Sequence, residues 1–263
     1  LTKFIYWIKN NINKFKITEI SAEKKLEKFR KKSPNYQFPS FSTISGSGPN
    51  GAIVHYRASK KTNRLIKKND IYLCDSGGQY HYGTTDVTRT LCFSKQSQKI
   101  KNIFTKVLKG HIGVVTCNLN KNTTGKDLDI VARNPLKKSG LDYAHGTGHG
   151  VGYFLNVHEG PQAISKFNHI RLKQGMIISN EPGYYEADKF GIRIENLVYT
   201  KKRKNKLIFE NLTLAPIEKD LINFKLLNNK EKKYLNEYHK KVYLTLNPYL
   251  NRSEKHWLKS ISN

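Results

Sequence analysis

The spacing of apolar residues predicts helices at the start, in the middle and at the end of the chain. Residues 1–17 mix apolar and basic side chains and are expected to form the end of a helix. Residues 18–33 and 100–111 carry apolar side chains at the period of a helix with one buried face. Two more helices are predicted, one near residues 126–138 and a charged, amphipathic one over residues 228–250.

Short apolar or β-branched runs between these helices predict strands. The expected strands are residues 38–45, 52–57, 71–77, 84–93, 175–182, 191–200 and 206–217. Short strands interleaved with helices favour an α+β domain. The 263 residues, 37% hydrophobic and 11% aromatic, supply enough apolar material for a sizeable core. A disordered chain is therefore excluded.

The charge balance points first to an anionic partner. Lys and Arg number 47 against 20 Asp and Glu, which gives a net charge of +27. However, Lys, Asn, Ile, Tyr and Phe are all abundant and have A/T-rich codons, so a biased genome can raise the lysine content without selection for a basic groove. The densest basic run, residues 201–206, lies between two expected strands and favours a solvated hairpin loop. We therefore expect no nucleic-acid partner, with a nucleic-acid module kept as an alternative.

The sequence predicts no membrane partner. No stretch approaches the roughly 20 consecutive apolar residues of a spanning helix, and Lys3 and Lys9 interrupt the apolar N-terminal segment. The cysteines Cys74, Cys92 and Cys117 are odd in number and widely spaced. This usage favours a reducing, cytoplasmic location and disfavours a cysteine-based zinc site.

Two aspartates fall close together in a predicted hairpin. A turn centred between Tyr80 and His81 would place Asp75 directly opposite Asp86. Directly opposed side chains have Cβ atoms about 4.5 to 5.5 Å apart, where like charges repel. Because the two strands are otherwise apolar or β-branched, both carboxylates are expected on a buried face with a cation between them. The alternative is a solvated hairpin with acids near its tip.

Two glutamates occupy comparable positions. Glu181 follows the apolar run MIISN at an expected strand end. Glu195 lies in GIRIENLVY, where alternation places it on the same face as Arg193. Either glutamate alone is more often a salt-bridged surface group, but together with the two aspartates they indicate a cluster of acids.

Four histidines are candidate functional residues. His145 and His149 have the spacing of a zinc-binding HExxH helix, but HGTGHGVG has glycine at every second position and no glutamate after its first histidine. This segment is a loop or strand, because each interior glycine costs a helix about 1 kcal/mol. Its glycines would let the backbone approach a ligand, or would form an ordinary flexible turn. His55 and His158 complete the set, although a lone histidine is more often a satisfied structural group.

The ordered series of motifs resembles one known family. The segments are NGAIVHY, CDSGGQY, GTTDVTRT, HGTGHGVGYFLNVHEGP, NEPGYY and FGIRIEN. They are similar to the catalytic domain of the Xaa-Pro aminopeptidases, in the pita-bread metallopeptidase family with methionine aminopeptidase and prolidase, and most resemble the large cytosolic type. The resemblance implies an α+β pita-bread fold, a curved antiparallel sheet flanked by helices with pseudo-twofold symmetry.

The resemblance also implies a domain organisation. Residues 1–17 would be the remnant of a preceding helix, residues 18–217 the catalytic domain and residues 218–263 a C-terminal helical extension. Relatives of this type carry additional N-terminal domains, so those of the full-length protein are expected to be missing here. Because relatives commonly dimerise, a homodimer is a further expectation.

The family's metal ligands match five residues of this chain: Asp75, Asp86, His149, Glu181 and Glu195. In the family pattern Asp75 would chelate one metal, His149 and Glu181 the other, and the remaining two acids would bridge both. The resemblance thus implies two divalent ions, with Mn²⁺ expected. Oxygen-rich ligation with a single imidazole also favours a hard ion of this kind.

The resemblance assigns catalytic and substrate-binding roles as well. Glu181 would act as general base and then as general acid. His158 and His55 match positions that bind substrate and stabilise the oxyanion, and His145 matches one that lines the proline pocket. Asn180 departs from the family pattern, in which an aspartate commonly precedes the glutamate, without affecting a ligand.

The implied activity is hydrolysis of the N-terminal Xaa-Pro bond of peptides with proline at the second position, by a hydroxide activated between two metals. A prolidase, which takes only dipeptides, is the nearest alternative. The fold also serves as a metal-free interaction module in some proteins, but those usually lose ligands.

Overall fold

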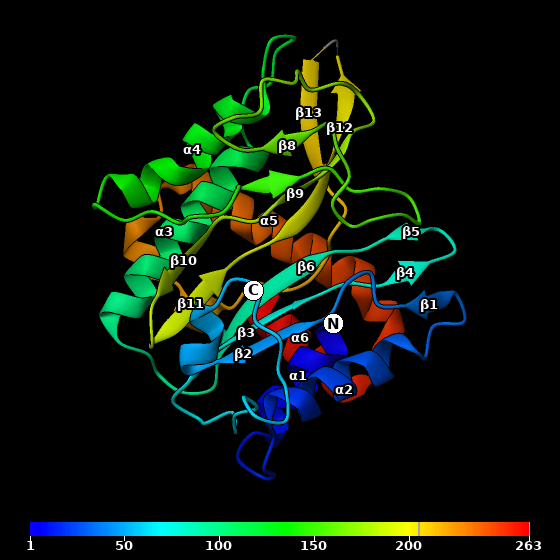
Figure 1. The fold of residues 1–263 in the computed structure, drawn as a ribbon, viewed down its shortest axis with the longest axis vertical. Helices are drawn as coiled ribbons and strands as arrows, with labels where there is room; N and C mark the ends of the chain where they lie inside the picture. The colour runs from blue at the N-terminus through cyan, green and yellow to red at the C-terminus, as the bar shows by residue number, and fades with distance from the viewer. Residues whose placement is uncertain (205, 263) are drawn as a thin grey trace.

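The computed structural model describes residues 1–204 and 206–262, in which small sheets pack against helices (Figure 1). Every strand pair among these residues is antiparallel. The α+β expectation is therefore confirmed.

The first part of the chain builds one sheet covered by two helices. Helices α1 (Thr2–Asn11) and α2 (Glu19–Arg30) precede strands β2 (Ile44–Ser47), β3 (Ile71–Ser76) and β6 (Val87–Cys92), which form a sheet in the order β2–β3–β6. Apolar side chains of both helices pack against β3 and β6 in one buried cluster. The two expected N-terminal helices are confirmed.

The second part of the chain also packs helices against a sheet. Helices α3 (Gln98–Val115) and α4 (Gly125–Lys137) cover β9 (Ile177–Asn180), β12 (Asn196–Arg203) and β13 (Lys206–Asn211), which pair in the order β13–β12–β9. Their apolar side chains form a second cluster. Both helices were predicted by the apolar period.

Short strands complete the chain between and beside these sheets. They are β1 (Tyr36–Phe38), β4 (Gln79–Tyr80), β5 (Gly83–Thr84), β7 (Gly148–His149), β8 (Ala163–Ile164), β10 (Gly183–Glu186) and β11 (Phe190–Arg193). Strand β11 contacts β3 and β6, so the second part of the chain packs against the first sheet through this strand.

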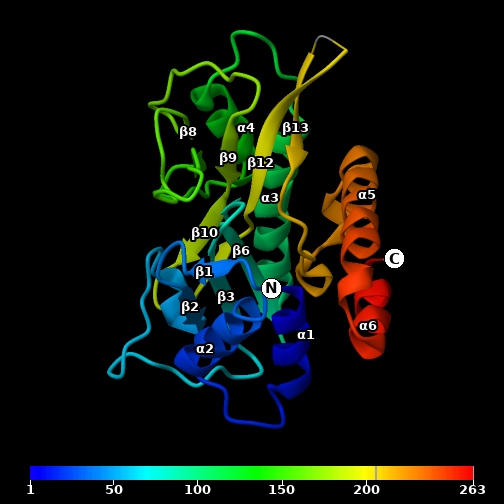
Figure 2. The same cartoon turned by 90° about the vertical axis from the view of Figure 1, so that its right-hand side faces the viewer.

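The C-terminal region contains two helices, α5 (Asn229–Leu246) and α6 (Arg252–Ser262). The single helix expected over residues 228–250 is wrong beyond Leu246, because Pro248 lies in a 3₁₀ turn that separates them. Figure 2 shows both helices along one side of the molecule. Their apolar side chains join α3 and β11 in the largest core cluster.

Two strand predictions are corrected by close backbone packing. Residues 52–57 are not a strand, because a 3₁₀ helix (Gly48–Ala52) is followed by a turn. Its Gly51 packs against Gly191 so closely that a Cβ on Gly191 would lie 1.8 Å from the Gly51 oxygen. The expected strand 191–200 divides into β11 and β12, with a break between residues 193 and 196.

The register of the β3–β6 hairpin differs from the prediction by two residues. Tyr80 pairs with Gly83, so the turn is centred one residue later than expected. Asp75 consequently pairs with Thr88, and direct pairing with Asp86 is wrong. Because residues two apart on a strand share a face, the shift keeps Asp86 a diagonal neighbour of Asp75.

The basic run 201–206 lies where β12 and β13 meet, with Lys202, Arg203 and Lys204 exposed, while Asn205 lies outside the described residues. This placement agrees with the hairpin expected from the sequence. Among the described residues, every helix is too short or too polar to cross a bilayer.

Candidate active site

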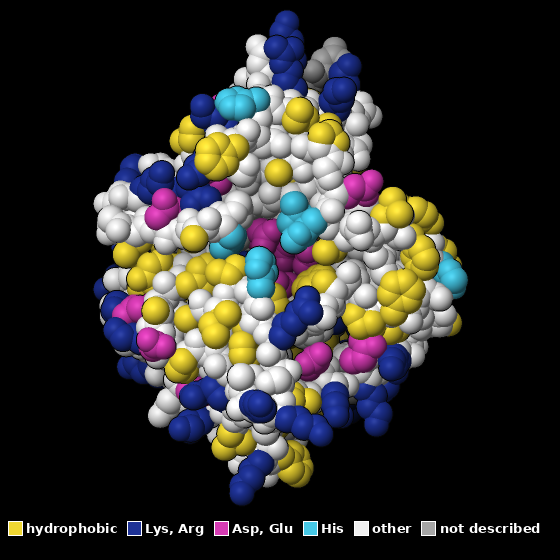
Figure 3. Space-filling view, viewed as in Figure 1, with side chains coloured by type: hydrophobic (Ala, Val, Ile, Leu, Met, Phe, Trp, Pro, Cys, Tyr) yellow, Lys and Arg dark blue, Asp and Glu magenta, His cyan; other side chains and the backbone are white. Residues whose placement is uncertain are grey.

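Acidic and histidine side chains gather in a hollow near the middle of the molecule (Figure 3). The cavity has a volume of about 370 Å³. It is lined by Asp75 of β3, by Asp86 directly before β6, and by His149 and Glu181 from the second part of the chain. Glu195 follows β11, and its nearest ligand atom lies within 4.8 Å of those of Asp86 and His149. The fold thus brings together five residues that are distant in sequence.

His149 links the acids of the two parts of the chain. Its Nε2 lies 3.5 Å from Asp86 Oδ2 and 3.3 Å from Glu181 Oε1. Its Nδ1 lies 2.9 Å from the carbonyl oxygen of Gly150, which fixes the ring with Nε2 facing the acids.

Arg193 provides positive charge beside Asp75. Its Nη2 donates to Asp75 Oδ2 at 2.7 Å, and its Nε lies 4.0 Å from Glu181 Oε2. Burial opposes its charge, but Tyr185 and Asp75 raise the pKa of Arg193 well above its usual value. As alternation predicted, Arg193 and Glu195 both face this region, and Arg193 offsets part of the negative charge.

Three of the acids are buried and incompletely hydrogen-bonded. The exposed fractions are 7% for Asp75, 4% for Asp86 and 1% for Glu195, and each has one buried carboxylate oxygen without a hydrogen-bond partner. Burial and neighbouring carboxylates raise the pKa of Asp86 to about 7 and that of Glu195 well above its usual value. Buried carboxylates are stable when they are paired or coordinate a metal, so these oxygens fit divalent cations.

The pKa values of Glu181 and His149 are shifted against the effect of burial, because the two side chains contact each other. Burial would raise the pKa of Glu181, but hydrogen bonding to His149 and the charge of that ring lower it to about 2. Burial would lower the pKa of His149, but Asp86 and Glu181 raise it to about 10. Glu181 is therefore held as a carboxylate, the form that can accept a proton.

The three other candidate histidines line the same cavity. The rings of His158 and His149 lie 4.0 Å apart between centroids. His145 Nε2 lies 2.9 Å from the hydroxyl oxygen of Tyr185, and His55 is exposed on the loop after the 3₁₀ helix. Burial lowers the pKa of His145 and, together with His149, that of His158. Both shifts favour the neutral form of the imidazole.

Sequence reasoning missed the hydroxyls that support the cluster. Ser179 Oγ accepts from the backbone N–H of His149 and donates to Glu181 Oε1, both at 2.9 Å. Thr88 Oγ1 donates to Glu195 Oε2 at 2.8 Å. A signal was available, since Ser179 lies two residues before Glu181 and Thr88 two residues after Asp86, where strand alternation keeps side chains on one face.

The glycines of HGTGHGVG serve backbone packing. A Cβ on Gly148 would lie 2.0 Å from the Ser179 carbonyl oxygen, and one on Gly150 would lie 2.0 Å from the Glu159 carbonyl oxygen. At these two positions the close approach is to neighbouring backbone, while Gly146 and Gly148 also line the cavity, so the expected approach to a ligand stays a prediction. The backbone packing sets His149 beside β9.

The fold and the acid–imidazole cluster define a metallopeptidase. The sequence pattern of metallopeptidase family M24 matches residues 1–202, and the pattern of that family's C-terminal region matches residues 205–262. The chain belongs to metallopeptidase family M24.

Two curated relatives of the chain share the name of one activity. The chain is 46% identical over 274 aligned residues to a probable Xaa-Pro aminopeptidase P of Paracoccidioides brasiliensis, an alignment that covers 98% of this chain and 44% of the relative. It is 47% identical to a protein of the same name in Laccaria bicolor, covering 95% of this chain and 41% of the relative. The chain therefore spans less than half the length of these curated relatives.

Solved structures share the fold. The X-prolyl aminopeptidase of Caenorhabditis elegans, described as a cytosolic enzyme with a di-nuclear active site, has a TM-score of 0.95 and 36% identity, with 100% of this chain and 45% of that chain covered. The prolidase of Pyrococcus furiosus has a TM-score of 0.69 and 31% identity over 81% of this chain and 60% of that chain. The predicted pita-bread fold is confirmed by these neighbours.

Proposed function

We propose that this chain is the catalytic part of a metal-dependent aminopeptidase that hydrolyses the N-terminal Xaa-Pro bond of short peptides. The observation that carries the proposal is the cluster of Asp75, Asp86, His149, Glu181 and Glu195, in which three buried carboxylate oxygens have no hydrogen-bond partner. The activity named for the relatives that cover almost the whole chain supports the choice of an Xaa-Pro bond.

The five residues would hold two divalent ions. The di-nuclear site named for the Caenorhabditis elegans enzyme supports the number, and the predominance of carboxylate donors supports manganese or a similarly hard ion. When bound, such ions lower the pKa of a shared water and polarise the peptide carbonyl.

The protein's own groups would then move the protons. Glu181 would accept a proton from the attacking water and return it to the leaving nitrogen. His158 and His55 line the same cavity and would donate N–H groups to the substrate and to the oxyanion. His145, held by the Tyr185 hydroxyl, would form the wall against the proline ring.

Prolidase activity is the second candidate, because prolidases are among the similar structures. The prolidase of Pyrococcus furiosus covers 81% of this chain, whereas the aminopeptidase of Caenorhabditis elegans covers all of it. This difference favours the aminopeptidase.

Peptide cleavage by the purified chain with added Mn²⁺ tests the proposal. An Xaa-Pro-Pro peptide should be cleaved at its first bond, with an Xaa-Pro dipeptide and an Xaa-Ala peptide cleaved far more slowly. Faster cleavage of the dipeptide would establish a prolidase, and equal rates with proline and alanine would remove the specificity. No cleavage and no metal binding would leave the metal-free interaction module. Metal-independent, salt-sensitive duplex binding would favour the nucleic-acid alternative.

Location and assembly belong to the same proposal. A cytosolic location is supported by the description of the Caenorhabditis elegans enzyme and by three free cysteines. The expected homodimer stays a prediction, which sedimentation of the purified protein tests.

A further inference from the structure

Helix α4 carries a buried ion pair that faces the loop before β7. Arg133 and Asp129 lie one turn apart on α4, with exposed fractions of 8% and 2%, and Arg133 Nε donates to Asp129 Oδ2 at 2.8 Å. A buried charge is stable when it is paired, so the pair alone would be an ordinary structural feature of the helix. However, the further hydrogen bonds of both side chains all run to residues 142–147.

Arg133 holds the backbone of this loop. Its Nη1 donates to the carbonyl oxygen of Tyr143 and its Nη2 to that of His145, both at 2.6 Å, and Nη1 also donates to Asp142 Oδ1 at 2.8 Å. The guanidinium lies over the Tyr143 ring, 4.0 Å from its centroid. Among the described residues, no backbone–backbone hydrogen bond involves residues 142–146. The arginine fork therefore replaces the backbone bonds that a helix or strand would give these residues.

Asp129 holds the end of the same loop. Its Oδ1 accepts from Thr147 Oγ1 at 2.6 Å. Because the Thr147 hydroxyl has one hydrogen, it must accept from the Tyr143 hydroxyl, its other partner. Thr147 is fully buried, and its carbonyl oxygen accepts from the Glu181 N–H at 2.8 Å. The ion pair thus fixes both ends of the stretch 143–147, whose middle residue is His145.

His145 lines the cavity of the candidate active site from this stretch. Its Nδ1 donates to the Gly146 carbonyl oxygen at 2.6 Å, and its Nε2 lies 2.9 Å from the Tyr185 hydroxyl oxygen. Its ring packs against the Tyr143 ring, with centroids 4.9 Å apart. Both ring nitrogens are engaged by the protein, so the ring offers carbon atoms to a substrate. The place of this ring in the cavity depends on the loop that the ion pair holds.

We propose that Arg133 and Asp129 are positioning residues for substrate specificity, which hold His145 where its ring contacts the proline ring of the substrate. The inference rests on the proposed function, in which His145 forms that wall. Neither Arg133 nor Asp129 lines the cavity, so both act through the backbone of the loop. Displacing a group in a site by about 1 Å can change a rate by a factor of about 100.

Cleavage of two peptides by Arg133→Lys, in the intact chain with added Mn²⁺, tests the proposal. Lysine keeps a charge beside Asp129 but lacks the planar fork that reaches both carbonyl oxygens. The ratio of kcat/KM for an Xaa-Pro-Pro peptide to that for an Xaa-Ala-Pro peptide should fall at least about tenfold, chiefly because KM for the proline peptide rises. Partial unfolding lowers both rates equally and leaves the ratio unchanged. An unchanged ratio would contradict the proposal.

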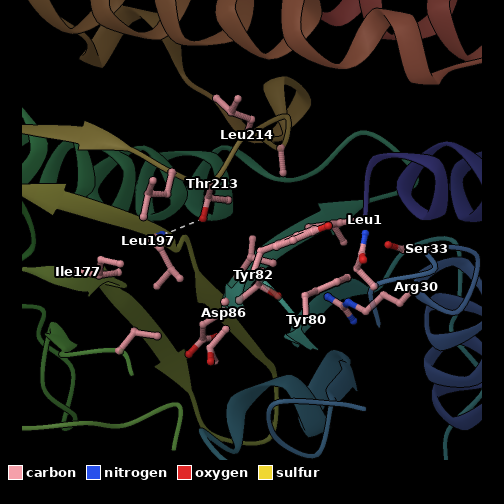
Figure 4. A pocket seen from close by; sticks show the side chains of 18 of the residues that line it. Leu1, Arg30, Ser33, Tyr80, Tyr82, Asp86, Ile177, Leu197, Thr213 and Leu214 are labelled. Carbon is pink, nitrogen blue, oxygen red and sulfur yellow. Dashed lines mark hydrogen bonds between the residues drawn. The ribbon is translucent and has the colours of Figure 1, made fainter. Parts of the chain in front are cut away.

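A second variant and a matched control accompany Arg133→Lys. Asp129→Asn, which keeps the shape of the side chain, should lower the ratio about fivefold and keeps the test available if Arg133→Lys unfolds. Thr213→Val is the control, because it also removes a hydrogen bond between a side chain and the backbone. Thr213 Oγ1 accepts from the Leu197 N–H at 2.8 Å, outside the loop and its network (Figure 4). Its ratio should equal that of the parent chain, and an equal fall in Thr213→Val would overturn the proposal.

Metal affinity separates this role from support of the metal cluster. Calorimetric titration with Mn²⁺ should give affinities within about threefold for the parent chain and Arg133→Lys, because the five cluster residues are unchanged. Loss of a group that supports metal ligands weakens affinity by about 10- to 100-fold. A loss of that size in Arg133→Lys would assign the ion pair to the cluster and overturn the proposal.

NMR of the metal-free protein tests the placement of His145 without any cleavage. The imidazole resonances of His145, identified by their loss in His145→Gln, should shift in Arg133→Lys, while those of His239, buried on α5, should not. Unchanged His145 resonances would contradict the inference whether or not the parent chain cleaves peptides. Shifted resonances in a chain whose parent cleaves no peptide would support the positioning of His145 and overturn the proposed function.

Discussion

Two buried carboxylate sites in this protein have opposite hydrogen-bonding arrangements. Glu19, at the start of α2, is fully buried, and both of its oxygens accept hydrogen bonds from uncharged donors. The donors are the Ser47 N–H, the Asn50 amide, the Tyr56 hydroxyl and the Arg64 N–H, at 2.7 to 3.1 Å. Glu195 is just as buried, but one of its oxygens accepts from Thr88 and the other has no partner.

The difference distinguishes a structural acid from a cation site. A carboxylate that receives several neutral hydrogen bonds is stable without a counterion, whereas neighbouring carboxylates with unpartnered oxygens repel one another and favour a bound cation. The Glu19 site joins α2 to the 3₁₀ helix and therefore contributes to stability. The cluster in the central hollow is costly without a cation and is expected to contribute to activity.

The largest expected effect is loss of cleavage in Asp86→Asn. An amide carries no charge to offset the cations that the cluster would hold, so kcat/KM should fall at least about a thousandfold, roughly 4 kcal/mol of transition-state stabilisation. The metal-free variant should melt no lower than the parent, because one of several repelling charges is removed. Peptide hydrolysis and thermal melting in chelator measure the two effects.

Asp188→Asn is a matched control for Asp86→Asn. Asp188 is exposed and has a φ of 58°, a conformation that asparagine tolerates. Cleavage within a few-fold of the parent by Asp86→Asn would contradict the role given to the cluster.

Glu19→Gln should show the opposite pattern, with lower stability and retained chemistry. The new amide group would face N–H and O–H donors, so the free energy of unfolding should fall by about 2 to 3 kcal/mol in urea titration. Cleavage per folded molecule should change little. A variant of unchanged stability with no activity would remove the distinction between the two sites.

Ser179→Ala should have a smaller effect, confined to the cluster. The hydroxyl links the His149 backbone to Glu181, and loss of such a supporting group weakens metal affinity by about 10- to 100-fold. Calorimetric titration with Mn²⁺ measures the affinity, and Ser179→Thr, which keeps the hydroxyl, should restore it. Equal loss in both variants would indicate a packing role instead.

The smallest expected effect concerns a buried imidazole far from the cluster. His239 Nε2 on α5 accepts from the Ile217 N–H at 3.1 Å, and burial lowers the pKa of His239 to about 4. A lowered histidine pKa contributes stability that is present above the unfolded value of about 6.5 and is lost as pH falls through 4. The parent chain should therefore lose more stability than His239→Gln between pH 7 and pH 4. Identical pH dependence of unfolding in the two proteins would contradict this account.

The sequence predicted most helices and the identity of the clustered acids, but not the contacts that depend on register. The apolar period located α2, α3 and α4, and the resemblance to the peptidase family identified the five cluster residues. The direct pairing of Asp75 with Asp86 was wrong by two residues. The position of a short turn decides the register, and many residue types fit such a turn, so the sequence does not fix its centre. Asp75 and Asp86 still share a face as expected, since a register shift of two residues preserves the alternation of side chains.

Other features depend on neighbours that are distant in the chain. Glu19 was not distinguished from a surface acid, because its donors come from residues 47, 50, 56 and 64. The strand expected at residues 52–57 failed because Gly51 packs against Gly191, a tertiary contact without a local signal. The break between α5 and α6 was missed although Pro248 marks it.

Manganese binding tests the central claim most directly. Anomalous diffraction at the manganese absorption edge from crystals grown with excess Mn²⁺ should give two peaks per chain, each within ligand distance of Asp86 and Glu195 and together contacted by Asp75, His149 and Glu181. Crystals of Asp86→Asn should lose at least one peak. Anomalous density elsewhere in the protein, or none among these five side chains, would contradict the account.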